Sequence, residues 1–160
     1  MATEEQTTHN VFGGVHAGGV IRSGQRLTIS NRVVSKLSFP VAKLNSPVGD
    51  VVLGIRQLDN TLLGSKVWGD VSSLAAYPTV TWIEVTLDTP LTVNEEVIIY
   101  VEFTGGDATD TLVIYTNSGD VKADEYKVQY VTSWTSYTDD DDAYIYTYEA
   151  VTFTPRIMIF

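Results

Sequence analysis

The sequence predicts an all-β fold, an antiparallel β-sandwich or barrel, from three observations. Short segments of alternating apolar and polar residues recur along the chain, and clusters of glycine, proline, asparagine and aspartate separate them. No segment shows the 3.6-residue apolar period of a helix. Because every second side chain of a strand points to the same face, each segment has one apolar face to bury against other strands.

Length, composition and charge limit the classes of partner. The 160 residues suit one domain, and 44% of them are hydrophobic, which is enough for one core. The formal net charge is −10, and residues 101–160 hold eleven acidic and only three basic side chains. A chain this acidic lacks the lysines and arginines that displace counterions from a phosphate backbone. The charge argues against nucleic acid and anionic membrane as partners and is compatible with cations, neutral sugars or another protein.

Cysteine is absent from the sequence, which excludes disulfides, thiolate metal sites and thiol catalysis. The N-terminus, MATEEQTTHN, lacks the cationic flank and apolar segment of a classical signal peptide. No run approaches the roughly 18 apolar residues of a membrane-spanning helix. We therefore expect no membrane insertion, and we expect any export to use another route or release by lysis.

Residues 1–23 are expected to form a polar, glycine-rich arm, and residues 24–160 a single sandwich domain. The first ten residues show no periodicity, and residues 11–24, VFGGVHAGGVIRSG, hold five glycines. Glycine at this density disfavours regular structure, so the arm should be a loop with at most a short edge strand.

Two apolar runs flank a turn between residues 24 and 56. The apolar positions of the first run are Leu27, Ile29, Val34, Leu37, Phe39 and Val41. The turn spans residues 46–50, where Pro47 fixes φ and Gly49 permits a positive φ. Residues 51–55 return as a strand and close a hairpin. Pro40 cannot donate to a ladder, so it indicates a sheet edge or a bulge.

Further strands follow in order after one short exception. Residues 71–76 are the only stretch with helical leanings, a single turn at most. The expected strands are 82–88, ended by Pro90, then 97–103, 112–115, 126–130, 144–148, 151–153 and 157–160. The total is roughly nine or ten short strands separated by turn residues, which is typical of a sandwich or barrel.

The run Asp139, Asp140, Asp141 and Asp142 is the best candidate metal site of the sequence. Calcium takes six to eight oxygen ligands, often from a short acidic loop. The run lacks the glycine and the terminal glutamate of an EF-hand loop, and consecutive like charges usually solvate a turn. A structural calcium is thus the alternative to a solvated turn, and no other cofactor is expected.

Aromatic residues concentrate in the last 40 residues of the chain. Rings beside acidic and hydroxyl groups suit carbohydrate binding, because the C–H face of a sugar stacks on a ring, and they equally suit protein interfaces. The candidate ligand-binding residues are Trp134, Tyr137, Tyr126 and Tyr144. Trp134 and Tyr137 lie in a Thr- and Ser-rich stretch and should be exposed. The alternating tyrosines of 144–148 favour one face of a strand that packs partly in the core.

The sequence offers no catalytic arrangement, so we expect a protein that is not an enzyme. Glu84, Glu102 and Glu149 could supply the paired carboxylates of a glycosidase, but any acidic β-sandwich offers such pairs by chance. His9 and His16 lack a third partner for a metal or catalytic site. No serine lies in a nucleophile-elbow motif.

The order of several motifs resembles a jelly-roll β-sandwich module of phage and archaeal-virus structural proteins and of secreted bacterial surface proteins. The motifs are Gly24-Gln25, Leu37–Phe39, Ser46–Gly49, Ile55-Arg56, Trp82 and Pro90–Thr92, and the match covers about residues 24–105. The resemblance implies the jelly-roll topology. Such modules include carbohydrate-binding modules, fibre and spike heads and capsid-associated domains, and some hold a structural calcium.

These features predict a non-enzymatic structural or interaction protein, a self-associating subunit of a virion surface or an extracellular assembly. Capsid decoration, spike and fibre proteins are examples of this class. Sheet edges and the N-terminal residues would join the subunits into a homo-oligomer or a larger assembly. The alternative is a carbohydrate-binding module that uses exposed Trp, Tyr and Asp residues. A glycan-active hydrolase is the least favoured class.

Overall fold

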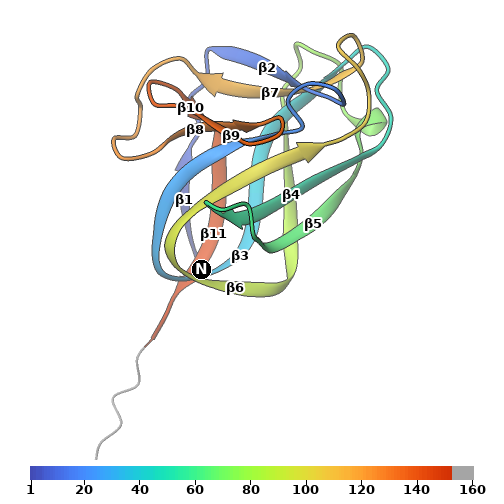
Figure 1. Ribbon diagram of the computed structural model, residues 1–160. Helices are drawn as coiled ribbons and strands as arrows, with labels where there is room; N and C mark the ends of the chain where they lie inside the picture. The colour runs from blue at the N-terminus through green and yellow to red at the C-terminus, as the bar shows by residue number, and fades with distance from the viewer. Residues whose placement is uncertain (153–160) are drawn as a thin grey trace, which may run out of the picture.

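The computed structural model describes residues 1–152, which form an antiparallel β-sandwich (Figure 1). The strands are β1 (Ala2–Gln6), β2 (Val11–Val15), β3 (Arg22–Leu44), β4 (Asp50–Gln57), β5 (Leu62–Asp70), β6 (Thr81–Phe103), β7 (Thr111–Asn117), β8 (Tyr126–Tyr130), β9 (Trp134–Tyr137), β10 (Asp141–Asp142) and β11 (Tyr144–Ala150). Within these residues the only helical element is one 3₁₀ turn, Val71–Ser73. The prediction of an all-β fold is confirmed.

Two strands of 23 residues, β3 and β6, pair with each other and bend, so that each contributes to both layers. The first half of β3 pairs with the second half of β6, and β8 and β4 extend this layer on its two sides. The strand order of the layer is β9-β8-β3-β6-β4-β5. The second half of β3 pairs with the first half of β6, and its other edge carries β11 and β7. The strands β1 and β2 lie outside β11 and β7.

The β3–β6 ribbon bends where its register shifts, between Ile29 and Arg32 and again between Val34 and Lys36. Opposite the second shift, residues 87–90 of β6 have no partner in β3. Pro90 lies in this bulge, where its missing N–H costs no hydrogen bond to β3. The prediction that Pro90 ends its strand is therefore wrong, because β6 continues through the bulge.

Pro40 lies inside β3, a central strand, and not at a sheet edge. On one side it faces Trp82 of β6. On the other side, β11 ends its pairing at Ser38 and β7 begins at Val41. Pro40 therefore falls in the gap between two neighbouring strands, where a missing N–H is tolerated.

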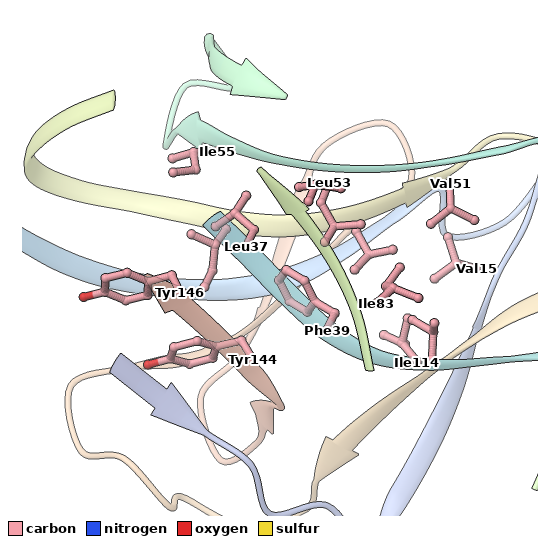
Figure 2. Close-up of a cluster of buried hydrophobic side chains, with 14 of the residues drawn as sticks. Val15, Leu37, Phe39, Val51, Leu53, Ile55, Ile83, Ile114, Tyr144 and Tyr146 are labelled. Carbon is pink, nitrogen blue, oxygen red and sulfur yellow. The ribbon is translucent and has the colours of Figure 1, made fainter. Parts of the chain in front are cut away.

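The main core lies between the two layers, as the alternation predicted. All six apolar positions expected for residues 27–41 are buried, and so are Val51, Leu53 and Ile55 on β4. Figure 2 shows Tyr144 and Tyr146 side by side on β11, with their hydroxyl groups directed away from the aliphatic side chains. Their rings are stacked with centroids 6.2 Å apart. The core is thus aliphatic in its main part and aromatic under β11.

Residues 1–23 contribute two strands to the sandwich. Residues 2–6 pair with β11, and residues 11–15 pair with β7. Glu4 on β1 accepts hydrogen bonds from Lys122 Nζ at 2.5 Å and from Arg32 Nη1 at 3.3 Å. The expectation of a loop is wrong for residues 2–6, because backbone pairing with β11 and the ion pairs of Glu4 hold them in a strand. Residues 11–15 form a short edge strand, as the expectation allowed.

The last strand of the described residues is β11, which ends at Ala150. Residues 151 and 152 lie beyond β11 and are not in a strand. The strand predicted at 157–160 lies outside the described residues. Within residues 1–152, no helix is long and apolar enough to cross a bilayer.

Candidate functional site

The structure divides the four-aspartate run into an exposed half and a buried half. Asp139 is exposed and Asp140 is half-buried. Asp141 and Asp142 form β10, which pairs with Asn117 and Thr116 of β7, and they are 0% and 1% exposed. The run is therefore not a single solvated turn, because its second half is drawn beneath neighbouring strands.

The carboxylate of Asp142 is held by protein donors. Ser23 Oγ and Thr116 Oγ1 each donate to it at 2.7 Å. Lys127 Nζ lies 4.0 Å from Asp142 Oδ1 and donates to Thr116 Oγ1 at 3.1 Å. Burial raises the pKa of Asp142 to about 6, although the nearby Lys127 ammonium opposes the rise.

The carboxylate of Asp141 is likewise held by protein donors, which differ from those of Asp142. Its carboxylate accepts hydrogen bonds from Gln25 Nε2 and from the backbone N–H groups of Val121, at 2.7 Å, and Lys122, at 3.1 Å. Gln25 Oε1 accepts a hydrogen bond from the backbone N–H of Asp142 at 2.9 Å. We call the six buried side chains the buried polar cluster: Ser23, Gln25, Thr116, Lys127, Asp141 and Asp142.

The buried polar cluster does not fit calcium. A calcium ion needs six to eight oxygen ligands, and here the oxygens of Asp141 and Asp142 accept hydrogen bonds from protein donors next to a lysine ammonium. In the described part of the chain, no three acidic or histidine side chains converge so as to hold a metal ion. These hydrogen bonds form a structural network that joins β3, β7, β8 and β10.

Trp134 and Tyr137 lie on β9 and do not share a site. Three positions separate them along a strand, so they point to opposite faces. Trp134 is half-buried and lines one surface hollow, whereas Tyr137 is 40% exposed and lines another with Asp139 and Asp140. The Thr- and Ser-rich stretch that holds them is not a loop but a strand that pairs with β8.

The Trp134 hollow is an open depression of about 400 Å³ between the β8–β9 turn and the loop after β4. The indole Nε1 of Trp134 donates to Asn60 Oδ1 at 3.2 Å, and the ring meets Tyr130 edge-on with centroids 5.1 Å apart. Asp59 and the hydroxyl residues Thr132 and Ser133 also line the hollow. An aromatic ring, a carboxylate and hydroxyl groups therefore lie together.

The other two predicted ligand residues lie elsewhere. Tyr126 is half-buried beneath the guanidinium of Arg26, which lies 5.3 Å from the ring centroid. Tyr144 is 0% exposed, and its hydroxyl donates to Glu125 Oε2 at 2.6 Å while it accepts from Lys122 Nζ at 3.0 Å. Burial and the Glu125 contact raise the pKa of Tyr144. Tyr144 therefore lines neither hollow, because alternation along β11 turns its side chain into the core.

A further surface was missed at the level of the sequence. Three stretches, 6–21, 71–83 and 111–119, contain no Asp, Glu, Lys or Arg, although the chain has thirty such residues. The structure brings the three together, because β2 pairs with β7 and the ring of Tyr77 lies 4.5 Å from that of Phe12. We call this surface the uncharged face, and its residues used below are His9, Val11, Phe12, Tyr77 and Tyr115.

The uncharged face is aromatic and partly open to solvent. Phe12 is 52% exposed, and Val11 and Tyr77 are exposed beside it. A hollow of about 280 Å³ lies among the rings of His9, Phe12, Tyr77 and Tyr115. Tyr115 is buried at its base, and its hydroxyl group has no hydrogen-bond partner among residues 1–152. The charge-free stretches were visible in the sequence, but their meeting depends on the fold.

No protein-family model matches the chain, and no curated protein matches it. Function is therefore inferred from two surfaces of the molecule, the Trp134 hollow and the uncharged face.

Proposed function

We propose that the protein is a non-enzymatic structural subunit that associates with further copies of itself through the uncharged face. This role suits a jelly-roll subunit of a virion surface or of an extracellular assembly. The observation that carries the proposal is the meeting of three charge-free stretches on one face that also exposes Phe12 and Tyr77.

Electrostatics favour this face for contact between identical chains. Each copy carries a formal charge of −10, so acidic surfaces of two copies repel each other. Residues 6–21, 71–83 and 111–119 bring no like charge to a contact. The exposed apolar side chains on the same face gain about 25 cal/mol for each Å² that leaves water.

The position of β2 supports the proposal. Within the described residues β2 pairs only with β7, so its other edge is open, and it carries no charge and no proline. Natural proteins protect open sheet edges from unwanted pairing with charged residues or prolines. The other edge strands have them: β1 carries two glutamates, β5 carries Lys66 and Asp70, and β9 runs into the four-aspartate run. The edge at β2 is therefore the one suited to docking.

The test is the molar mass of the purified chain by sedimentation velocity over a wide concentration range. We expect the wild type to exceed the monomer mass, and Phe12→Ala to weaken association at least about tenfold, because an interface aromatic contributes more than 1.4 kcal/mol. Leu62→Ala is the matched control, since Leu62 is 48% exposed on the edge strand β5. A wild type that stays monomeric at every concentration refutes the proposal.

A second candidate function is carbohydrate binding at the Trp134 hollow. The observation that favours it is the common lining of this hollow by Trp134, Asp59 and the hydroxyl groups of Thr132 and Ser133. An aromatic face with acceptors at its rim suits the C–H face and hydroxyl groups of a neutral sugar.

A glycan array tests the second candidate. We expect wild-type binding to be lost in Trp134→Ala and kept in Tyr137→Ala, because Tyr137 lies on the opposite face of β9. Circular dichroism of both variants checks that the sandwich is intact. An array on which the wild type binds no sugar eliminates this candidate.

A further inference from the structure

Two neighbouring glycines of β2 are not required by the packing inside the subunit. A Cβ atom on Gly13 would come no closer than 3.9 Å to any other atom, and one on Gly14 no closer than 3.5 Å. Neither glycine has a positive φ. Alanine would therefore fit at both positions, and it would destabilise a strand less than glycine does. By contrast, the backbone of Ile99 and Tyr100 leaves no room for a side chain at Gly24, and the Tyr100 ring leaves none at Gly54.

A glycine inside a strand often marks a place where another backbone or a ligand approaches closely. Phe12 and Gly14 lie on the outer face of the sheet, since Phe12 is opposite Tyr115 and Val15 points into the main core. Both outer positions are exposed. The open edge of β2 thus presents one large ring next to an empty position on the same face.

We infer that β2 pairs antiparallel with β2 of a second copy, about a twofold axis that passes beside Gly13. Gly13 then faces Gly13 of the second copy, and Phe12 faces Gly14 of the second copy. This inference rests on the proposed function, self-association through the uncharged face, and adds to it the strand pairing and its register.

Symmetry and the pattern of side chains select this register. A twofold axis perpendicular to the sheet keeps the outer faces of both copies on one side. Such an axis requires one residue of β2 to lie opposite the same residue in the second copy. Phe12 can then face a glycine only when the axis lies at Gly13. Each Phe12 ring covers the empty position at Gly14 of the other copy, an aromatic–glycine pair across the junction. Val11 faces Val15, a pair of β-branched residues that suits a strand.

The absence of cysteine from the chain makes disulfide trapping a clean test. In the proposed pairing, residues 13 of the two copies are directly opposite, with Cβ atoms about 5 Å apart, whereas residues 14 are diagonal neighbours about 7–8 Å apart. We expect Gly13→Cys to form a covalent dimer under mild oxidation at least about tenfold faster than Gly14→Cys, because a disulfide needs close Cβ atoms. Both variants keep Phe12.

A second pair of variants guards against a fold defect in Gly13→Cys. In the inferred register, residue 12 of one copy faces residue 14 of the other, so an equal mixture of Phe12→Cys and Gly14→Cys chains should give a mixed dimer. Neither chain alone should cross-link at a comparable rate. Trapping in the mixture, together with trapping of Gly13→Cys, supports the register from both faces of the strand.

The outcomes separate the pairing from the proposed function. If the wild type associates and Phe12→Ala weakens it, while Gly13→Cys and the mixture cross-link no faster than Gly14→Cys alone, the β2 pairing is overturned and self-association stands. If the wild type is monomeric at every concentration, both the β2 pairing and self-association through the uncharged face are overturned.

Discussion

The ring of Tyr100 lies over Gly54, so that a Cβ atom on Gly54 would be 2.5 Å from the Tyr100 hydroxyl oxygen. The two residues face each other on β4 and β6, on the side of the layer that points away from the main core. Tyr100 is nevertheless only 1% exposed, because Arg22, Arg56 and Trp134 cover its ring. Glycine at position 54 therefore makes room for a buried aromatic outside the main core.

The first prediction follows from this contact. Gly54→Ala should lower the free energy of unfolding by about 2 kcal/mol, because an overpacked site costs typically 1–3 kcal/mol. Chemical denaturation of the single variant measures the loss. The control is the double variant with Tyr100→Leu, in which the cost of Gly54→Ala should shrink because the ring is gone. An equal cost in both backgrounds would mean that the Tyr100 ring is not what excludes a side chain at position 54.

The second prediction concerns the attachment of β1. Glu4 contacts Lys122 and Arg32, and the hydrogen bond from Lys122 is the main cause that lowers the pKa of Glu4. Glu4→Gln should therefore speed amide hydrogen exchange in residues 2–6 and lower the free energy of unfolding by about 1 kcal/mol or less, since the pair is partly exposed.

The control for Glu4 is its neighbour. Glu5→Gln removes one charge from an exposed side chain on the same strand and should leave hydrogen exchange in β1 unchanged. A lowered carboxyl pKa contributes stability above its ordinary range and loses it as pH falls through the folded value. The difference between wild type and Glu4→Gln should accordingly vanish in acid. A difference that persists in acid would assign the effect to packing of the side chain rather than to its charge.

The sequence predicted the elements that carry a clear alternation, and the core followed from them. Leu37 and Phe39, or Ile83 and Val85, are buried as expected, because a strand with one apolar side has one way to face the interior. The union of residues 81–88 with 97–103 into one bent strand was not predictable, since a bulge at Pro90 and a strand end show the same local signals.

The candidate sites were less predictable because they depend on contacts between distant segments. Trp134 donates to Asn60, 74 positions away in the chain, and Phe12 meets Tyr77 across two different elements. Periodicity says which face a residue occupies but not which segments lie beside it. For the same reason the sequence could not show that Asp141 and Asp142 turn inward, since their partners lie on β3 and β7.

The last prediction concerns pH and the buried polar cluster. Burial raises the pKa of Asp142 from 3.8 to about 6, so between these values the folded chain keeps a proton that the unfolded chain has released. The free energy of unfolding contributed by Asp142 therefore falls as pH rises from about 4 to about 6 and stays constant above. The total fall is roughly 3 kcal/mol, because each pKa unit is worth about 1.4 kcal/mol. Asp142→Asn removes this titration.

Denaturation curves of wild type and Asp142→Asn across this pH range measure the effect. Their difference cancels groups that titrate in both proteins, among them Glu4, whose lowered pKa acts in the opposite direction. Above pH 6 the variant should be less stable than wild type only by the free energy that Lys127 loses without the Asp142 carboxylate. In acid the difference in the free energy of unfolding should grow in favour of wild type. Asp139→Asn leaves the buried cluster intact and should retain the fall. If the free energies of unfolding of wild type and Asp142→Asn change in parallel with pH, then Asp142 and the rest of the buried polar cluster are hydrated.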